Sequence, residues 1–465
     1  MRAALLESIR SRQEPKEPNK LLRRVLQHRG PLEEVRALVA AHPNVLHEVF
    51  VDSTGTGRRS IISGNSVHCV HGMLPLHASI LAQAPAEVTL FLLESYPGAA
   101  SVAASDGRIP LHFAASNKLT TEEVVSALLT AYPEGAKSKL RDGRFPLHFA
   151  AKWSLPPTVT AMLLGANPDA TRQRDLNGLL PLHWSASYSG PEVNRLLLCS
   201  FPQASAIRDR EGLLPLHWAA ENAASIDVVA PLLSSFPQAA REKDGLGRLP
   251  LHRAAGSSAS CDVLQALLAA WPQGAQERDF SGKLPLHHAA KRQGPLLKIG
   301  LLLAAYRPAA DMEDLANRRP LQEALTIAAF RDDLPYSVGL VSLGADPMLV
   351  DRAGMTPSGV YANLRSISVE ERLERVGALS AAREAYLLGK KRDENWERRA
   401  ALMLVLASNG FRPLSAVRLA LVKAAAERDG PPSPVPIKTD QQRKAYRLSL
   451  ILSCDGLVRL IASFL

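Results

Sequence analysis

The sequence has little of what a disulfide scaffold or a zinc site requires. Its four cysteines, Cys69, Cys199, Cys261 and Cys454, lie far apart, and no two of them form a C-x-x-C pair. This pattern excludes a disulfide framework and a cysteine-rich metal site, and it is typical of a reducing compartment.

Segments that would cross or enter a membrane are also missing. No apolar run approaches the roughly 18 residues that a membrane-spanning helix needs. Glu7 and Arg10 interrupt the first ten residues before the apolar core of a signal peptide could form. We therefore expect no membrane span and a cytoplasmic or nuclear location.

Catalytic and phosphate-binding motifs are absent as well. The sequence contains no G-x-x-x-x-G-K-[ST] loop, no G-x-S-x-G elbow and no H-E-x-x-H pair. We therefore predict a protein that is not an enzyme and that uses neither a cofactor nor a metal.

Aromatic residues make up only 5% of the chain, and the net charge of +10 is concentrated at its two ends. Residues 51–360 carry 28 basic and 28 acidic residues, whereas 1–50 carry 9 and 6, and 361–465 carry 18 and 11. The C-terminal cations are dispersed among acids with almost no aromatics between them. That composition favours a solvated helical surface over nucleic-acid binding.

The sequence does contain an internal repeat, which allows a chain of 465 residues to avoid a single oversized core. The string P-L-H recurs every 34 to 36 residues, with its histidine at His77, His112, His148, His183, His217, His252 and His287. Pro320-Leu321-Gln322 continues the register with glutamine, and Gly354–Pro357 resembles a decayed ninth copy.

Each copy has the pattern of a turn followed by two helices. In one copy, Asp209 and Gly212 supply turn chemistry, because glycine adopts positive φ readily. Pro215 suits the first position of a helix, and the following Leu-His-x-Ala-Ala lets neighbouring helices approach closely. A V-V-x-x-L-L stripe predicts the second helix, which ends at Phe236-Pro237 because proline disfavours α conformation in the preceding residue.

This pattern resembles the ankyrin repeat, whose T-P-L-H-x-A-A hallmark occurs here as L-P-L-H-[WF]-A-A. Gly165-Ala166-Asn167-Pro168 and Gly344-Ala345-Asp346-Pro347 match the family's usual second-helix ending. The resemblance implies an all-α solenoid of stacked helix-turn-helix repeats that binds other proteins. The period of about 35 exceeds the family's usual 33, so we expect a longer loop after the second helix. Where Leu, Ile or Phe replaces the hallmark Thr, we expect a loop hydrogen bond to be missing.

The repeat register and the changes in composition predict the order of the segments. We expect an N-terminal tail at 1–19, a helical N-terminal cap at 20–50, a loop insertion at 51–67, an ankyrin-repeat array of about eight to nine repeats at 68–365, a helical C-terminal region at 366–428, a Pro-rich linker at 429–440 and a C-terminal amphipathic helix at 441–465.

Two residue columns could be mistaken for sites. Stacked helices lie about 10 Å apart, whereas Zn–N bonds are about 2 Å, so equivalent histidines cannot share one ion. In ankyrin repeats this histidine is a structural residue that ties neighbouring turns together. The next position holds Phe113, Phe149, Trp184 and Trp218, for which core packing is favoured over an aromatic binding stripe.

The candidate partner-binding residues lie at the turn tips and at the ends of the first helices, which the resemblance implies as the binding face. The residue after the turn Gly (or Asn317) is never acidic in eight copies: Met73, Arg108, Arg144, Leu179, Leu213, Arg248, Lys283 and Arg318. The ends of the first helices add Lys152, Trp153, Tyr188, Lys291 and Arg292.

We predict a concave groove with basic ends, 108–153 and 248–318, around an apolar middle of Leu179, Leu213 and Tyr188. Such a groove would suit an acidic, partly hydrophobic protein surface. The alternative is that the turn cations only pair with neighbouring turn aspartates.

The leading hypothesis is therefore a non-catalytic interaction scaffold. The alternative is a substrate-recognition adaptor of a ubiquitin ligase, in which the C-terminal helices recruit the ligase. Its support is the end of the chain, 457–465, which resembles half an F-box-type helix.

Overall fold

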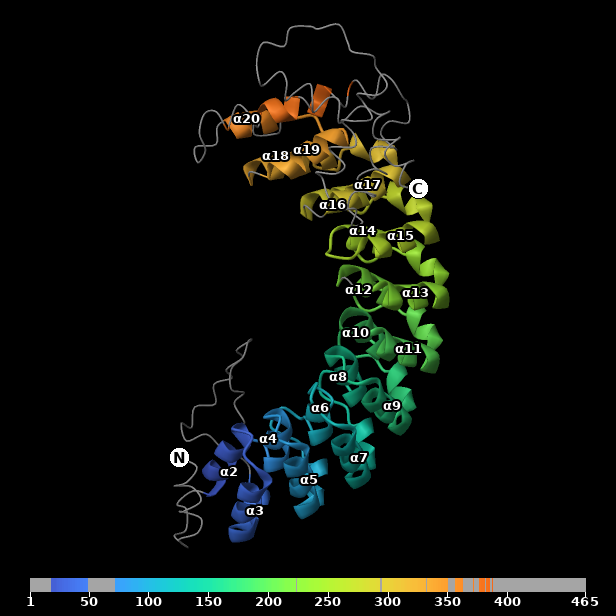
Figure 1. The fold of residues 1–465 in the computed structure, drawn as a ribbon. Helices are drawn as coiled ribbons and strands as arrows, with labels where there is room; N and C mark the ends of the chain where they lie inside the picture. Colours follow the sequence, from blue (N-terminus) through green and yellow to red (C-terminus); the bar gives the residue numbers. More distant parts are fainter. Residues whose placement is uncertain are drawn as a thin grey trace, which may run out of the picture. The chain divides into compact units, whose positions relative to one another are not determined.

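The computed structural model describes residues 18–48, 72–222, 224–292, 295–331, 333–349 and 356–362, with scattered positions between 371 and 387. Every regular element in these ranges is a helix (Figure 1), which confirms the predicted all-α repeat solenoid. The predicted loop insertion at 51–67, the linker at 429–440, the last helix at 441–465 and nearly all of 366–428 lie outside the described residues.

The chain divides into two compact units, residues 1–219 with 227–236 and residues 220–226 with 237–465, called here the N-terminal and C-terminal units. The helices that lie wholly or mostly in the N-terminal unit are α2 (Pro18–Gln27), α3 (Leu32–Ala41), α4 (Pro75–Leu81), α5 (Ala86–Ser95), α6 (Pro110–Ala114), α7 (Glu122–Ala131), α8 (Pro146–Trp153), α9 (Pro157–Ala166), α10 (Pro181–Tyr188), α11 (Pro191–Ser200), α12 (Pro215–Glu221) and α13 (Ile226–Ser235).

The helices of the C-terminal unit follow the same order of first and second helices. They are α14 (Pro250–Ala255), α15 (Cys261–Ala270), α16 (Pro285–Arg292), α17 (Leu296–Ala305), α18 (Pro320–Phe330), α19 (Leu334–Ser342) and α20 (Pro357–Ala362).

Short 3₁₀ helices follow the second helices in both units. They are η1 (Pro43–Leu46), η2 (Pro97–Ser101), η3 (Pro133–Lys137), η4 (Pro168–Arg172), η5 (Pro202–Ala206), η6 (Pro237–Arg241), η7 (Pro272–Gln276) and η8 (Arg307–Ala310). Before η3, Tyr132 leaves the α region at φ −144° and ψ 81°, because it precedes Pro133. These 3₁₀ helices occupy the segment that the 35-residue period predicts to be longer than usual.

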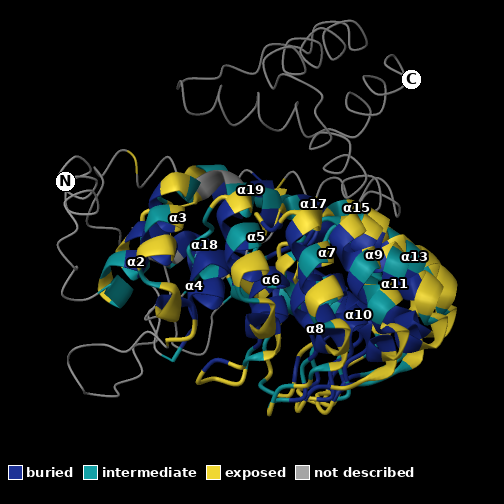
Figure 2. Cartoon of the chain, turned by 90° about the horizontal axis from the view of Figure 1, so that it is seen from below, coloured by how far each residue is buried: buried dark blue, intermediate teal, exposed yellow. Residues whose placement is uncertain are grey.

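The first helices are short, and packing stabilises them. Helix α6 has five residues and α8 has eight, whereas an isolated helix needs about 12–15 to be stable in water. In the N-terminal unit, α4, α6, α8 and α10 contact one another in sequence and form one layer, and α5, α7, α9 and α11 form the second. Figure 2 shows buried residues where the layers meet and exposed residues on the outer helix faces and at the turns.

The turn before each first helix needs a residue with positive φ. Gly282 has φ +74°, and Asn317 takes this position in the eighth copy with φ 54°. The residue before the helix proline, such as Phe145, is extended and makes no side-chain cap, as expected where Thr is replaced.

A buried histidine makes the hydrogen bonds that hold this turn. His148 Nδ1 accepts the backbone N–H of Phe145 at 3.1 Å, and its Nε2–H donates to the carbonyl oxygen of Gln173 in the next repeat at 3.2 Å. The same two kinds of bond occur at His77, His252 and His287. In the eighth copy, Gln322 donates to the carbonyl oxygen of Leu349 at 2.9 Å.

The C-terminal unit also holds a buried lysine that the sequence analysis did not identify. Lys298 on α17 is almost fully inaccessible to solvent. Its ammonium group donates to the carbonyl oxygens of Ser257 at 2.7 Å and Ala254 at 3.4 Å, and so satisfies acceptors at the end of α14.

We expect His148→Ala to lower the free energy of unfolding by about 1–3 kcal/mol, because it leaves buried backbone groups unpaired. His148→Gln should lower it less, since Gln322 makes the equivalent bond to the next repeat. Urea unfolding followed by circular dichroism measures both values. Equal losses in the two variants would show that the ring is a space filler only.

Stability should also rise with pH between about 4 and 6.5. Burial lowers the pKa of His77, His112, His148, His183 and His287 to about 4. In this window the unfolded chain binds more protons than the folded chain. The free energy of unfolding is therefore highest above pH 6.5, where the histidines are neutral in both states, and it falls as the pH is lowered toward 4. Urea titrations at several pH values test this, and His148→Gln should reduce the slope. A flat profile would contradict the burial of neutral rings.

Candidate functional site

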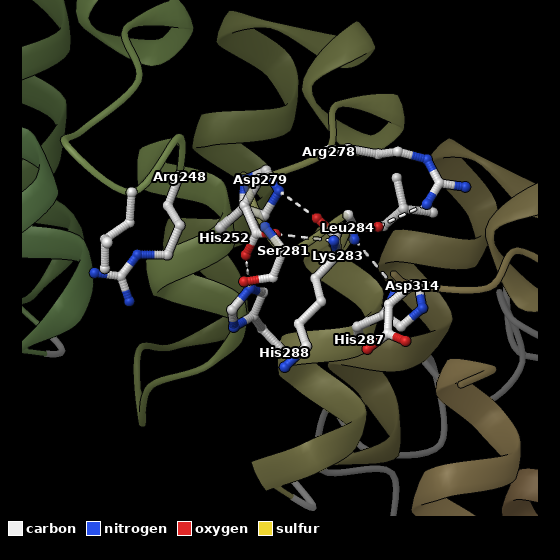
Figure 3. Close-up of polar contacts among 12 residues, drawn as sticks. Arg248, His252, Arg278, Asp279, Ser281, Lys283, Leu284, His287, His288 and Asp314 are labelled. Carbon is white, nitrogen blue, oxygen red and sulfur yellow. Dashed lines mark hydrogen bonds and ion pairs between the residues drawn. The ribbon is translucent and has the colours of Figure 1, made fainter. Parts of the chain in front are cut away.

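The turns that carry the predicted binding residues are built around a buried aspartate. In the C-terminal unit, Asp279 Oδ1 accepts the backbone N–H groups of Ser281 at 2.8 Å and Lys283 at 2.9 Å (Figure 3). Its Oδ2 accepts Nε2–H of His288 at 2.9 Å. One carboxylate therefore closes the turn and fixes a side chain nine residues later.

The nine-residue pairing recurs in other copies. The donors are Trp184 to Asp175 at 3.2 Å, Trp218 to Asp209 at 2.9 Å and Arg253 to Asp244 at 2.6 Å. Ala104 and Leu140 replace the aspartate in two copies, and there the residue nine positions later is Phe113 or Phe149. In these copies a polar donor accompanies the carboxylate, and an apolar ring accompanies its absence. The eighth copy differs, because the residue nine positions after Asp314 is Glu323, which is an acceptor and pairs with Arg318.

This pairing explains the roles of the aromatic residues that directly follow the P-L-H histidines. Phe113 and Phe149 are buried in the core, as the sequence analysis favoured. Trp184 and Trp218 are only half-buried, and each donates to a turn aspartate, a role that was not predicted from the sequence. The sequence pattern that could have predicted this bond is the nine-residue spacing between the turn aspartate and the donor side chain.

The predicted apolar middle of the groove is wrong at two positions. Leu179 is 4% exposed and Leu213 is 1% exposed, so both belong to the core rather than to a binding surface. The chain reverses at the positive-φ glycine, and the next side chain lies beneath the turn. Only a long cationic side chain at this position reaches solvent.

The arginines at this position pair with aspartates of their own turns. The ion pairs are Arg108 with Asp106 at 2.6 Å, Arg144 with Asp142 at 3.0 Å, Arg248 with Asp244 at 3.2 Å and Arg318 with Asp314 at 2.8 Å. The side-chain hydrogen bond to Asp314 raises the pKa of Arg318, and the bonds that Asp314 accepts lower its own pKa although burial opposes this. The alternative interpretation of these cations, local pairing with turn aspartates, therefore holds at all four.

Other predicted residues do come together on α8 and α10, which are in contact. Trp153 is 42% exposed and Tyr188 is 51% exposed. The rings of Trp184 and Tyr188 stack at 6.0 Å, and Lys152 Nζ lies 4.7 Å from the Trp184 ring centre. We call Lys152, Trp153, Trp184 and Tyr188 the aromatic–basic cluster.

Cations lie over the aromatic faces of this cluster. Lys152 Nζ is 5.6 Å from the Trp153 ring, and the Arg144 guanidinium is 5.5 Å from the Trp184 ring. Burial, and then the charge of Arg144, lower the pKa of Lys152. The structure thus gathers exposed aromatic area and positive charge in one place.

The predicted residues of the C-terminal unit form a separate set. Lys291 and Arg292 are exposed in the last turn of α16, while Arg248, Lys283 and Arg318 are half-buried at the turns. In the described part of the chain, no group of three potential ligands could hold a metal ion. No described helix has the length and apolarity needed to cross a bilayer.

Comparison with protein families supports the repeat assignment. A family model of ankyrin repeats, in three copies, matches residues 147–239. The chain is an ankyrin-repeat protein. A search of curated proteins gave no match. Ankyrin repeats are generally protein-interaction modules, and their fold is typically non-catalytic. The matched repeats include all four residues of the aromatic–basic cluster.

In this ankyrin-repeat protein, Trp218→Phe should lower the free energy of unfolding by about 0.5–1.5 kcal/mol, because Asp209 loses a buried hydrogen-bond donor. Phe149→Trp is the matched control, since position 140 is Leu and offers no acceptor to an added indole N–H. Chemical unfolding measures both. If Trp218→Phe is neutral, the nine-residue pairing contributes nothing to stability.

Proposed function

We propose that this protein is a non-catalytic protein–protein interaction scaffold that binds its partner through the aromatic–basic cluster of the N-terminal unit. The observation that carries the proposal is the exposure of Trp153 and Tyr188 on neighbouring first helices, with Lys152 beside them. Trp, Tyr and Arg are the residues that most often dominate binding energy at protein interfaces.

The charge of the cluster supports an acidic, partly hydrophobic partner surface. Arg108 and Arg144 form ion pairs with aspartates of their own turns. Lys152 instead lies on helix α8, with its ammonium group over the exposed Trp153 ring and the half-buried Trp184 ring. A partner carboxylate could meet this cation while apolar groups cover Trp153 and Tyr188. Lys291 and Arg292 remain candidates for additional contacts from the C-terminal unit. We expect this interaction to take place in the cytoplasm or nucleus.

The proposal is tested with the full chain as bait in affinity capture. Trp153→Ala with Tyr188→Ala should lose a partner that the wild type retains, and with the purified partner the Kd should rise by about tenfold or more, or about 1.4 kcal/mol. The fold should persist, since both side chains are substantially exposed.

Leu119→Ala is the control, because Leu119 is another exposed apolar residue of the N-terminal unit outside the cluster. Lys152→Glu should slow association and reduce its dependence on salt. Unchanged binding by the cluster variants would refute this assignment of the binding face.

A further inference from the structure

The repeats of the N-terminal unit are joined to one another by different numbers of hydrogen bonds. Each repeat is taken here to begin after a 3₁₀ helix, so the His112 repeat is 102–137, the His148 repeat is 138–172 and the His183 repeat is 173–206. All of these residues lie in the described part of the chain. The two interfaces between these three repeats differ in how they are held.

Three kinds of hydrogen bond join the His148 and His183 repeats: one from the histidine ring, one from a turn N–H and one at the ends of the first helices. The donor–acceptor pairs are His148 with Gln173 at 3.2 Å, Leu176 with Asp142 at 2.8 Å, and Ser189 with Ala151. The turns are also close together, since a β-carbon at Gly143 would lie 2.9 Å from Cα of Asp175. This interface is therefore tied at both ends of its first helices.

The next interfaces on either side are tied in similar ways. The donor–acceptor pairs are His77 with Val102 at 3.0 Å, Asn117 with Ile80 at 2.9 Å, Arg210 with Asn177 at 3.0 Å and Arg174 with Arg208 at 3.1 Å. Hydrogen bonds between repeats are thus the usual arrangement in this unit.

The histidine and turn bonds are missing between the His112 and His148 repeats. His112 Nε2 is buried and has no hydrogen-bond partner, although the nearby carbonyl of Ser138 favours the protonated ring. The N–H of Arg141 makes no backbone bond to the preceding turn. A β-carbon at Gly107 would meet nothing closer than Cδ2 of Leu140 at 3.9 Å. The turns at this interface are therefore neither bonded nor closely packed.

Apolar contacts take the place of these bonds. Ala104 and Leu140 stand where other copies have the turn aspartate. The rings of His112 and Phe149 meet edge to face across the interface, with their centres 5.7 Å apart. Apolar burial is non-directional, whereas a hydrogen bond weakens steeply as its distance and angle change. These contacts therefore resist a rotation of one repeat against the other less than hydrogen bonds do.

A hydrogen bond in the layer of second helices does cross this interface. The buried side-chain amide of Asn167, the residue after α9, donates to the carbonyl oxygen of Ala136 in η3 at 2.9 Å. The interface is therefore held in its layer of second helices and is free of such bonds at its turns. Two bodies that are joined on one side can rotate about that side.

We propose that the N-terminal unit bends at a hinge between the His112 and His148 repeats, with the bond from Asn167 to Ala136 as its pivot. Opening of the hinge separates the turns around Gly107 and Leu140 and changes the curvature of this unit. The aromatic–basic cluster lies on α8 and α10, both on one side of the hinge. The cluster therefore stays intact as the hinge moves, and the hinge does not depend on the proposed function.

Double electron–electron resonance between two nitroxide labels tests the hinge in the full chain, with the four native cysteines replaced by serine. Suitable label sites are Glu87, Thr158 and Asp227, which are exposed and directly precede a buried valine of a second helix. Labels at 87 and 158 lie two repeats apart and span the hinge. Labels at 158 and 227 also lie two repeats apart but span tied interfaces only.

We expect the distance distribution of the 87/158 pair to be about twice as broad as that of the 158/227 pair, because only the first pair spans the hinge. Asn167→Ala should broaden the 87/158 distribution further and leave the 158/227 distribution unchanged. Ser189→Ala is the matched control. It removes one bond from an interface that keeps two others, and it should change neither distribution.

Equal widths for the two pairs in the otherwise unmodified chain would overturn the hinge, and this comparison does not depend on the Asn167 variant. An unchanged 87/158 distribution in Asn167→Ala would overturn the assignment of the pivot. The circular dichroism of each labelled protein should match the wild type, so that a broader distribution reports bending and not loss of helix.

Discussion

First helices of five to eleven residues are too short to be stable in isolation. Buried polar side chains fix the turns before them. The histidine of P-L-H accepts the N–H of the residue before the helix, and its other nitrogen donates to the next repeat. The turn aspartate accepts two further N–H groups and one side chain nine residues later. The repeats of His252 and His287 have both kinds of bond, so each is closed internally and tied to its successor.

The bonds that close the turns also show which charged side chains have a structural role and which surfaces are open to a partner. The arginines after the turn glycines are engaged with aspartates, and the leucines at that position are in the core. What the repeats leave to solvent is different in the two units. The N-terminal unit exposes Trp153 and Tyr188 at the ends of first helices and Leu176 at a turn tip, whereas the C-terminal unit exposes Leu246, Phe280 and Leu315 at turn tips.

The repeated L-P-L-H-[WF]-A-A string predicts the fold through its resemblance to the ankyrin hallmark. Its proline and alanine pair each have one physical role in a helix-turn-helix repeat, and the role of its histidine is implied by the resemblance. The place of Lys152, Trp153 and Tyr188 after that string predicts them as partner-binding residues, and this role stays a prediction. Trp153 and Tyr188 are exposed, and Lys152 is half-buried. Leu179 and Leu213 were misassigned, since position after a turn glycine does not show which way a side chain points. The role of Lys298 depends on carbonyl groups more than forty residues away, which no local pattern reveals.

Amide hydrogen exchange at the turns of the N-terminal unit tests the network most directly. The N–H groups of Leu179 and Leu180 are bound by Asp175 and His183, although both residues precede helix α10. We expect these amides to exchange as slowly as those inside α10, and we expect His183→Ala to speed exchange at Leu180 selectively. Exchange of both amides at the rate of an unprotected loop would show that these side chains do not fix the turn.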